Sequence, residues 1–410
     1  MSLPTASPTT ANVRPLIPRC DLFCAVVDNF GDIGVCWRLA RQLVREHGWS
    51  VRLWVDDLAS FRHLRPDIDP TLAAQRCDGV DVRRWDADFG PINDGNAPGD
   101  IVIEGFACHL PDAYLQAMHA RKQTGNAPVW INLEYLSAES WVNEFHMQKS
   151  VHPQLGLVKT IFMPGFTPGA GGLIRERELF SRRDAFLASP ELRDVWWQRT
   201  LGLTAAPQEA LIVSLFGYEN AALPALLTQW SENETPVVCL VPQGRIAPAV
   251  GEWFGRETLA PRESATRGAL TAYGLPFVPQ HDFDHLLWAC DLNFVRGEDS
   301  FVRAQWAAKP FVWHIYPQAD NAHHAKLDAF LEHYLAELPS DALPLGHAER
   351  EALRTFWHLW NGYASTAPDW AALATALPAL RRHAQAWASA QAHLPDLARQ
   401  LASFVENQVK

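Results

Sequence analysis

Residues 23–44 read FCAVVDNFGDIGVCWRLARQLV, and this stretch decides the fold class. Its first five residues are apolar and have the length of a buried strand, so we expect a strand over 23–27. From Val35 onward, apolar residues recur at a spacing of four on one helix face, and Gly48 marks the end of that helix. Residues 50–55, SVRLWV, read as the next strand. Strand, loop, helix and strand in this order form half of a doubly wound α/β sheet.

The loop between that strand and helix carries two carboxylates, Asp28 and Asp32. Loops at the carboxyl ends of strands bind ligands in such sheets. This loop is not a dinucleotide fingerprint, because only Gly31 and Gly34 remain of the glycine pattern and the carboxylates would repel a phosphate. The pair suits a cation or a proton acceptor. The simpler alternative is that Asp32 caps the helix and Asp28 ends the strand.

The composition is that of a globular protein with large cores. The chain has 410 residues, of which 48% are hydrophobic and 20% are charged, and this length suits two domains. The formal net charge of −11 does not favour a surface that binds duplex nucleic acid, and no nucleic-acid partner is expected. Seven cysteines without a C-x-x-C pair are typical of a reducing cytoplasm, where we expect the protein.

No membrane association is expected either. No apolar run has the length needed to span a bilayer. Residues 1–19 are rich in Pro, Thr, Ser and Ala and lack the apolar core of a signal peptide, so they are predicted to be a disordered tail.

Further strands in the first half end in polar loops. Strands are predicted over 80–85, 100–104 and 128–133. The last of them runs into Glu134 and Tyr135, which become candidates for the acceptor side of a cleft if the sheet is parallel. The alternative for these two residues is a helix cap.

Three other patterns indicate sites only weakly. Asp86-Ala87-Asp88 has the D-x-D form that binds a metal in one class of glycosyltransferase, but such a pair is common by chance. Neither Cys108-His109 nor His323-His324 has ligand partners at convincing spacing, so no metal site is predicted. The glycine-rich segment 162–176 could cradle a ligand or close over one.

A second α/β unit begins after a break near residues 205–207. Helices are predicted from 341 onward, with breaks at Pro378 and Pro395. The predicted strands of this unit are 210–216, 236–241, 275–278, 291–295 and 310–315. The predicted domains are 20–180, 205–375, and C-terminal helices over 376–410 that could cross back onto the first domain.

The loop after strand 291–295 is the second informative site. It contains Arg296, Gly297, Glu298 and then Ser300 at a helix start. Free backbone N–H groups at a helix start form an anion site, to which Arg296 adds a fixed charge and Ser300 a hydroxyl. A diphosphate could be held there without a metal, while Glu298 could accept hydrogen bonds from sugar hydroxyls. The alternative is a capped helix with a solvated charge run.

Two α/β sheets whose strand-end loops face each other across a cleft suggest the GT-B architecture of glycosyltransferases. The anion site lies in the second half and the paired carboxylates in the first. That polarity suits a C-terminal domain that binds a nucleotide sugar and an N-terminal domain that presents the acceptor and a base.

Several long motifs resemble those of the EarP family, bacterial protein-arginine rhamnosyltransferases that modify elongation factor P. The resemblance runs from about residue 20 to about residue 365. The motifs are VVDNFGDIGVCWRLARQL at 26–43, NLEYLSAE at 132–139, GGLIRE at 171–176, SLFGYEN at 214–220 and LLWACDLNFVRGEDSFVRAQWAAKPFVWHIYPQ at 286–318.

The resemblance implies a GT-B fold, TDP-β-L-rhamnose as donor, inversion at the anomeric carbon and no cofactor or metal. Elongation factor P would be the protein partner, modified at one arginine. Asp28 and Asp32 match the two essential aspartates of the family, Asp32 resembles its proposed general base, and we place Glu298 with them in the catalytic group. The residues expected to bind the donor are Gly31, Phe216, Tyr218, Gln280, Phe283, Arg296, Glu298, Asp299, Ser300 and Tyr316.

Two alternatives of other kinds remain at this point. One is a GT-B transferase with the same donor and another acceptor, either a different protein or a small guanidine. The other is a non-catalytic sugar-nucleotide-binding module. The presence of both Asp28 and Asp32 argues against the module, which would need the donor loop but no base.

Overall fold

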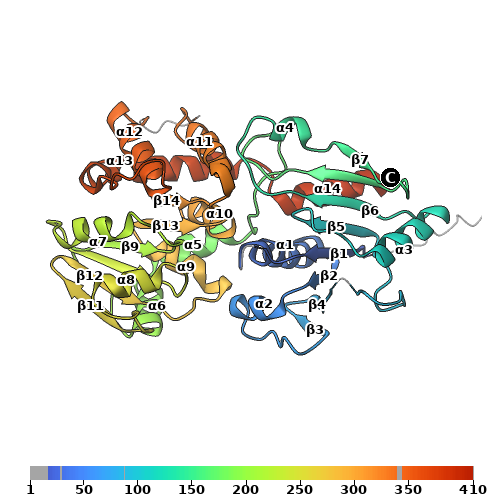
Figure 1. The fold of residues 1–410 in the computed structure, drawn as a ribbon, viewed down its shortest axis with the longest axis horizontal. Coiled ribbons are helices and arrows are strands. Elements are labelled where there is room, and N and C mark those ends of the chain that lie inside the picture. Colours follow the sequence, from blue (N-terminus) through green and yellow to red (C-terminus); the bar gives the residue numbers. More distant parts are fainter. Residues whose placement is uncertain (1–16, 28–29, 87, 339–343, 410) are drawn as a thin grey trace, which may run out of the picture.

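The structure of the chain is a computed structural model, which describes residues 17–27, 30–86, 88–338 and 344–409. Two mainly parallel β-sheets, each flanked by helices, lie side by side along the long axis (Figure 1). This arrangement confirms the predicted α/β class with two Rossmann-like domains.

The N-terminal domain is built on an eight-stranded sheet in the order β3-β4-β2-β1-β5-β6-β8-β7. The hairpins β3–β4 and β7–β8 at its two edges are antiparallel, and the other neighbouring strands are parallel. The strands are β1 Arg19–Cys24, β2 Ser50–Val55, β3 Ala74–Cys77, β4 Val80–Arg84, β5 Ile101–Gly105, β6 Val129–Leu133, β7 Lys149–Val151 and β8 Val158–Phe162. The helices are α1 Gly31–His47, α2 Leu58–Leu64, α3 Asp112–Gln123 and α4 Val142–Phe145.

The C-terminal domain is built on a six-stranded sheet in the order β11-β12-β10-β9-β13-β14, of which only the β11–β12 pair is antiparallel among the described strands. The strands are β9 Leu211–Leu215, β10 Val237–Val241, β11 Ser264–Arg267, β12 Leu270–Gly274, β13 Leu292–Arg296 and β14 Phe311–His314. The helices are α7 Leu223–Ser231, α8 Ala247–Trp253, α9 Gln280–Ala289, α10 Asp299–Trp306, α11 Ala322–Tyr334, α12 His347–Trp360 and α13 Trp370–Ala392, with a short 3-10 turn at Ala319–Asn321.

In each sheet, the strand that comes first in the sequence lies in the middle, and the chain adds later strands on one side of it and then on the other. β1 lies between β2 and β5, and β9 lies between β10 and β13. Ligands bind outside the carboxyl ends of strands at such switch points. The topology therefore places two loops at ligand-binding positions, the β1–α1 loop of one domain and the β13–α10 loop of the other.

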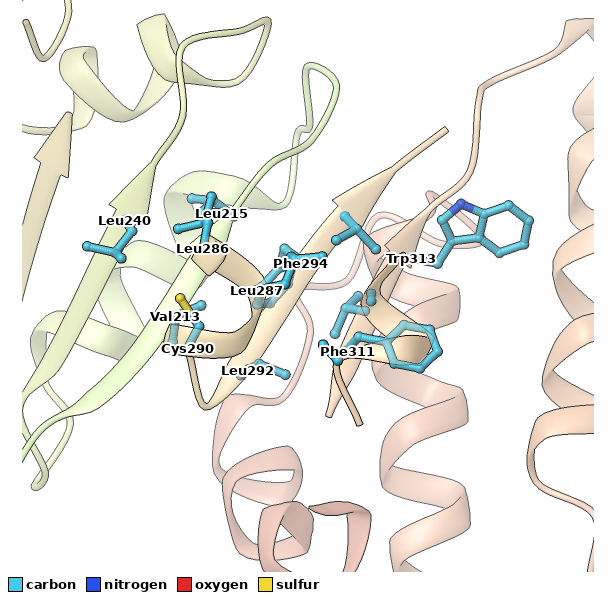
Figure 2. Close-up of a cluster of buried hydrophobic side chains, with 14 of the residues drawn as sticks. Val213, Leu215, Leu240, Leu286, Leu287, Cys290, Leu292, Phe294, Phe311 and Trp313 are labelled. Carbon is cyan, nitrogen blue, oxygen red and sulfur yellow. The ribbon is translucent and has the colours of Figure 1, made fainter. Parts of the chain in front are cut away.

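The core of the C-terminal domain explains why its strands are nearly continuous apolar runs. Figure 2 shows side chains of the neighbouring strands β9, β10, β13 and β14 packed beside Leu286 and Leu287 of α9. Val213, Leu240 and Phe294 are all fully buried within this layer. Strands covered on both faces must bury every side chain, so the alternation that marks a half-exposed strand is absent.

The first strand was predicted too late in the chain. β1 is Arg19–Cys24 rather than 23–27, and the residues after Cys24 leave the sheet. The start of the strand was missed because Asp21, which lies inside β1, is charged. Asp21 is fully buried, but its carboxylate accepts hydrogen bonds from Arg52 Nη2 at 2.6 Å and from the Gly99 N–H at 2.7 Å. A buried carboxylate that is paired and hydrogen-bonded is compatible with a central strand.

Two predictions in the second half were also wrong. The strand expected at 275–278 is β12, Leu270–Gly274, which follows β11 through the two-residue turn Gly268-Ala269. The break expected at Pro378 does not occur, because α13 continues through it. Pro378 lies on the exposed side of α13. Because proline has no N–H, the carbonyl four residues before it loses its helical hydrogen bond, and water can bind that carbonyl instead. The break at Pro395 is confirmed, since α13 ends at Ala392 and α14, Leu397–Val409, begins beyond it.

The chain crosses between the domains twice. Helices α5, Leu179–Ala188, and α6, Pro190–Leu201, lead from the N-terminal sheet to β9. After α13 the chain returns, and α14 lies among the elements of the N-terminal domain (Figure 1). The Gln42 side chain of α1 donates to the Asp396 carboxylate just before α14 at 3.0 Å.

The glycine-rich segment has a packing role instead of an open ligand loop. A Cβ on Gly171 would lie 2.7 Å from the Phe162 ring, and one on Gly172, which has a φ of +76°, would lie 2.3 Å from the Pro395 carbonyl oxygen. These glycines therefore let the segment pack closely against β8 and the start of α14.

Candidate active site

The β1–α1 loop and the β13–α10 loop line one continuous cleft between the domains. It consists of two adjoining cavities that share Gly31, Gly297 and Glu298. The first cavity encloses about 630 Å³ and the second about 870 Å³, each volume including open solvent at the mouth. The first cavity is lined by Phe30, Gly31, Leu64, Phe216, Tyr218, Pro242, Gln243, Phe277, Val278, Gln280, Phe283, Arg296, Gly297, Glu298, Asp299 and Ser300. The second is lined by Val27, Gly31, Asp32, Phe106, Tyr135, Leu136, Gly297, Glu298, Phe301, Trp313, Ile315, Tyr316, Gln318, His323 and Lys326.

Asp32 stands in the first turn of α1 and lines the second cavity. Its side chain is 2% exposed and accepts a hydrogen bond of 2.7 Å from the Val27 N–H. The Tyr135 hydroxyl also bonds to it, and the pKa of Tyr135 is raised, first by burial and then by the negative charge of Asp32. Tyr135 thus stays protonated and can keep donating to this carboxylate. The other predicted aspartate, Asp28, lies outside the described residues.

Glu298 faces Asp32 from the opposite domain. It occupies the N-cap position of α10, and its Oε2 accepts a hydrogen bond of 3.0 Å from the Leu136 N–H of the N-terminal domain. Burial raises the pKa of Glu298 to about 7, and the negative charges of Asp32 and Asp299 act in the same direction. At neutral pH this carboxyl can therefore either donate or accept a proton.

Nine of the ten predicted donor-binding residues line the first cavity, and four of them form a cluster of aromatic rings around a cation. The Arg296 guanidinium lies over the rings of Phe216, at 4.7 Å, and Tyr218, at 4.6 Å. The ring of Phe283 packs edge-on against Phe216, with centroids 5.6 Å apart. A flat base can stack on aromatic rings such as these, and a phosphate can pair with the cation beside them.

The ring of His314 packs edge-on against Tyr218, with centroids 5.2 Å apart. Burial lowers the pKa of His314 to about 3, and the positive charge of Arg296 lowers it further in the same direction. His314 is therefore uncharged, and its Nδ1 accepts the Tyr218 N–H at 3.3 Å. Tyr316, another predicted donor residue, lies edge-on to Tyr218 with ring centroids 5.5 Å apart and lines the second cavity.

The remaining predicted residues hold the loop and the domain boundary. The Ser300 hydroxyl donates to the Arg296 carbonyl and accepts the Arg296 N–H at 3.1 Å, so it braces the loop from within. Gln280 Nε2 donates to the Gly34 carbonyl of α1 at 2.7 Å and to Asp299 Oδ2 at 3.0 Å. The predicted donor residues Ser300, Gln280 and Asp299 all line the first cavity. Their contacts with a ligand remain predictions.

Of the two acceptor-side candidates, only Tyr135 lies in the cleft. Glu134 is absent from the described lining of both cavities, and its Oε1 accepts a hydrogen bond of 2.6 Å from Asn132. The ring of Phe106 stacks on Tyr135 with centroids 4.4 Å apart, and Lys326 Nζ lies 5.8 Å from the centre of the Tyr135 ring.

Sequence reasoning missed Phe106 and Lys326. Phe106 had a signal, because it follows β5 directly and so had to lie at the same edge as Asp32. Its φ of +57° turns the chain there. No sequence signal indicated Lys326, because only the tertiary packing of α11 brings this residue to the cleft.

Within the described ranges, no group of three or more His, Cys, Asp or Glu side chains could hold a metal ion. No helix among the same residues is both long enough and apolar enough to cross a membrane.

The chain is similar to known proteins over most of its length. The model of the family described as elongation factor P rhamnosyltransferase EarP matches residues 20–406. A protein-arginine rhamnosyltransferase of Pseudomonas putida is 50% identical over 387 residues, which are 94% of this chain and 98% of that protein. One of Shewanella oneidensis is 41% identical, covering 94% of this chain and 97% of the other.

A solved structure concerning EarP-mediated arginine glycosylation of translation elongation factor EF-P shares the fold. It superposes with a TM-score of 0.66 at 37% identity and covers 95% of this chain and 99% of its own. The predicted GT-B arrangement is thereby confirmed. The chain therefore belongs to the EarP family of elongation factor P rhamnosyltransferases, and it is an enzyme of the glycosyltransferase class.

Proposed function

We propose that this enzyme transfers L-rhamnose from TDP-β-L-rhamnose to the guanidinium of one arginine of elongation factor P, with inversion and without a metal or other cofactor. Work on a translation factor would place it in the cytoplasm. The observation that carries the proposal is that Asp32 and the Arg296–Ser300 loop line the same cleft, in a chain of this family.

The acceptor arginine would enter the second cavity beside Asp32. A guanidinium has a pKa above about 12 and is a poor nucleophile while protonated. A carboxylate can hold its plane through paired hydrogen bonds and accept a proton as the new bond forms. Asp28, the neighbouring carboxylate in the sequence, is proposed to share this task. The hydrogen bonds from Val27 and Tyr135 support the assignment of Asp32, because they fix the orientation of its carboxylate.

The donor would span both cavities, with its nucleotide in the first. Phe216 and Phe283 offer rings for the thymine, and Arg296 with the start of α10 offers positive charge for the diphosphate. Gln280 would face the base, and Tyr218 and Tyr316 would border the sugar. Glu298, at the junction of the two cavities, is suited to hydrogen-bond a sugar hydroxyl.

One displacement then accounts for the whole reaction. The guanidinium nitrogen attacks the anomeric carbon and forms the C–N bond while the bond from that carbon to the TDP oxygen breaks. The nitrogen loses its proton to Asp32, and the electron pair of the broken bond leaves with TDP, whose growing charge Arg296 stabilises. Attack opposite to the leaving group turns a β-linked donor into an α-linked product.

The test is the intact mass of unmodified elongation factor P after incubation with the enzyme and TDP-β-L-rhamnose. A gain of one deoxyhexose, mapped by fragmentation to a single arginine, is expected. Donor binding by calorimetry without any mass gain would overturn the proposed acceptor. Neither binding nor mass gain would overturn the donor as well.

A further inference from the structure

A buried ionic cluster connects the two domains behind the cleft. It joins Arg38 of α1, Glu176 of the segment before α5, and three side chains of the C-terminal domain, Asp284, Asp299 and Arg303. Arg38 is 2% exposed and Arg303 1%. Figure 1 shows α1 at the boundary between the domains, on the side of α9 and α10.

Arg38 reaches the donor loop directly. Its Nε lies 2.7 Å from Asp299 Oδ1, and its Nη2 donates to the Gln280 carbonyl at 3.3 Å. Both partners line the first cavity, so a residue of the N-terminal domain holds two predicted donor residues in place. Gly34, one turn earlier in α1, allows this close approach, because a Cβ there would lie 3.3 Å from Gln280 Nε2.

The other members of the cluster anchor Arg38 itself. Arg303 forms a two-pronged pair with Asp284, with both N···O distances 2.7 Å, and also binds Glu176 at 2.6 Å. Arg38 lies 3.5 Å from Glu176 and 3.8 Å from Asp284. Burial opposes ionisation of Glu176, but the charges of Arg303 and Arg38 lower its pKa to about 2, so the cluster is ionised at neutral pH.

Arg38 and Asp32 belong to the same helix, six residues apart, which is about 9 Å along its axis. Helix α1 therefore carries the proposed base, Asp32, at its start, and further along it carries Arg38, which contacts the donor loop. Displacing reacting groups by about 1 Å can reduce a rate by about a hundredfold.

We propose that Arg38 is a positioning residue, which fixes the distance between Asp32 and the donor through its contact with Asp299. This inference rests on the proposed function, because it assumes that Asp32 acts on a donor held by the Arg296–Ser300 loop. A lysine cannot replace Arg38, since a single ammonium cannot contact Asp299, Glu176 and the Gln280 carbonyl together.

The test compares the same substitution at two arginines of α1. Removing the cation entirely would leave the buried Asp284 and the partly buried Glu176 and Asp299 with Arg303 as their remaining cation in the cluster, which risks unfolding. Arg38→Lys is therefore the variant of choice. Arg41→Lys is its matched control, because Arg41 pairs with Asp78 inside the N-terminal domain at 3.1 Å. Each variant is assayed for kcat with elongation factor P and TDP-β-L-rhamnose, for TDP affinity by calorimetry and for melting temperature.

We expect Arg38→Lys to lower kcat about tenfold or more while TDP affinity changes less than about threefold. Arg41→Lys should leave both within about twofold. In an Asp299→Ala background, which lacks the oxygen that Arg38 contacts, Arg38→Lys should lower kcat clearly less than it does in the wild-type background.

A kcat of Arg38→Lys within about twofold of wild type would overturn the inference, and so would an equal loss in the Asp299→Ala background or in Arg41→Lys. Failure of the proposed function would look different, because the wild-type enzyme would then form no product.

Discussion

The two cavities of the cleft are built in contrasting ways. In the first, the cation Arg296 lies between two aromatic rings of its own domain, Phe216 and Tyr218. In the second, carboxylates from different domains meet, because Asp32 comes from α1 and Glu298 from the start of α10. The first cavity thus depends mainly on one domain, whereas the second exists only when both domains are correctly placed. Binding of the nucleotide and transfer of the sugar should therefore be separable by mutation.

The largest effect should come from the second cavity. Asp32→Asn keeps the size of the side chain but removes its ability to accept a proton, so kcat should fall about a thousandfold. TDP affinity, measured by calorimetry, should stay within about threefold, because the nucleotide would bind in the first cavity. Near wild-type turnover would show that Asp32 is not the base.

The converse effect is expected in the first cavity. Arg296→Met should weaken TDP binding about thirtyfold, because a buried cation facing the diphosphate is lost. Arg256→Met is a suitable control, since Arg256 pairs with Glu263 at the surface of the same domain. Equal TDP affinities for the two variants would remove Arg296 from the proposed donor site.

A smaller effect should appear in stability at the junction of the cavities. The pKa of Glu298 is raised to about 7, so the native protein retains a proton that the unfolded chain releases. Its contribution to stability is therefore present at low pH and declines as the pH rises toward 7. Glu298→Gln, which resembles the protonated form, should melt higher than wild type at pH 8 and show little difference at pH 5.

Melting curves of both proteins between pH 5 and 8 would check this expectation. Glu252→Gln, at an exposed position in the same domain, should show no such pH-dependent gain. A gain for Glu298→Gln that stays constant with pH would contradict the assigned protonation of Glu298.

The smallest effect is expected from chelation. With Arg296 and the start of α10 supplying positive charge to the leaving group, EDTA should leave the rate unchanged. Loss of activity that added magnesium or manganese restores would instead favour a metal at Asp86 and Asp88, the D-x-D pair of the sequence.

The two loops that form the cleft could be located from the sequence because each follows a long apolar strand. Asp32 after β1 and Arg296 at the end of β13 were found in this way, and parallel-sheet topology explains why their loops face a common cleft. The strand boundaries were harder to predict. Asp21 looked too polar for a buried strand, but in the structure Arg52 and the Gly99 N–H donate hydrogen bonds to its carboxylate.

Contacts between the domains could not be predicted. The pairing of Arg38 with Asp299 joins residues 261 positions apart. Arg38 looked like an ordinary helix-surface charge in the sequence, and Asp299 was expected to bind the donor. The hydrogen bonds of the Ser300 hydroxyl to the Arg296 backbone, four residues before it, were not predicted either. Such pairings depend on how two independently patterned domains dock, which periodicity does not encode.

The most direct test of the account is the anomeric configuration of the product. In the proposed single displacement, Asp32 and the leaving diphosphate act on opposite sides of one sugar carbon. The one-bond carbon–proton coupling of the rhamnosyl-arginine, measured by NMR on modified elongation factor P, reports this configuration. An α-linkage is predicted from the β-linked donor. A β-linkage would contradict the single displacement, because retention requires either a covalent intermediate or attack from the side of the leaving group.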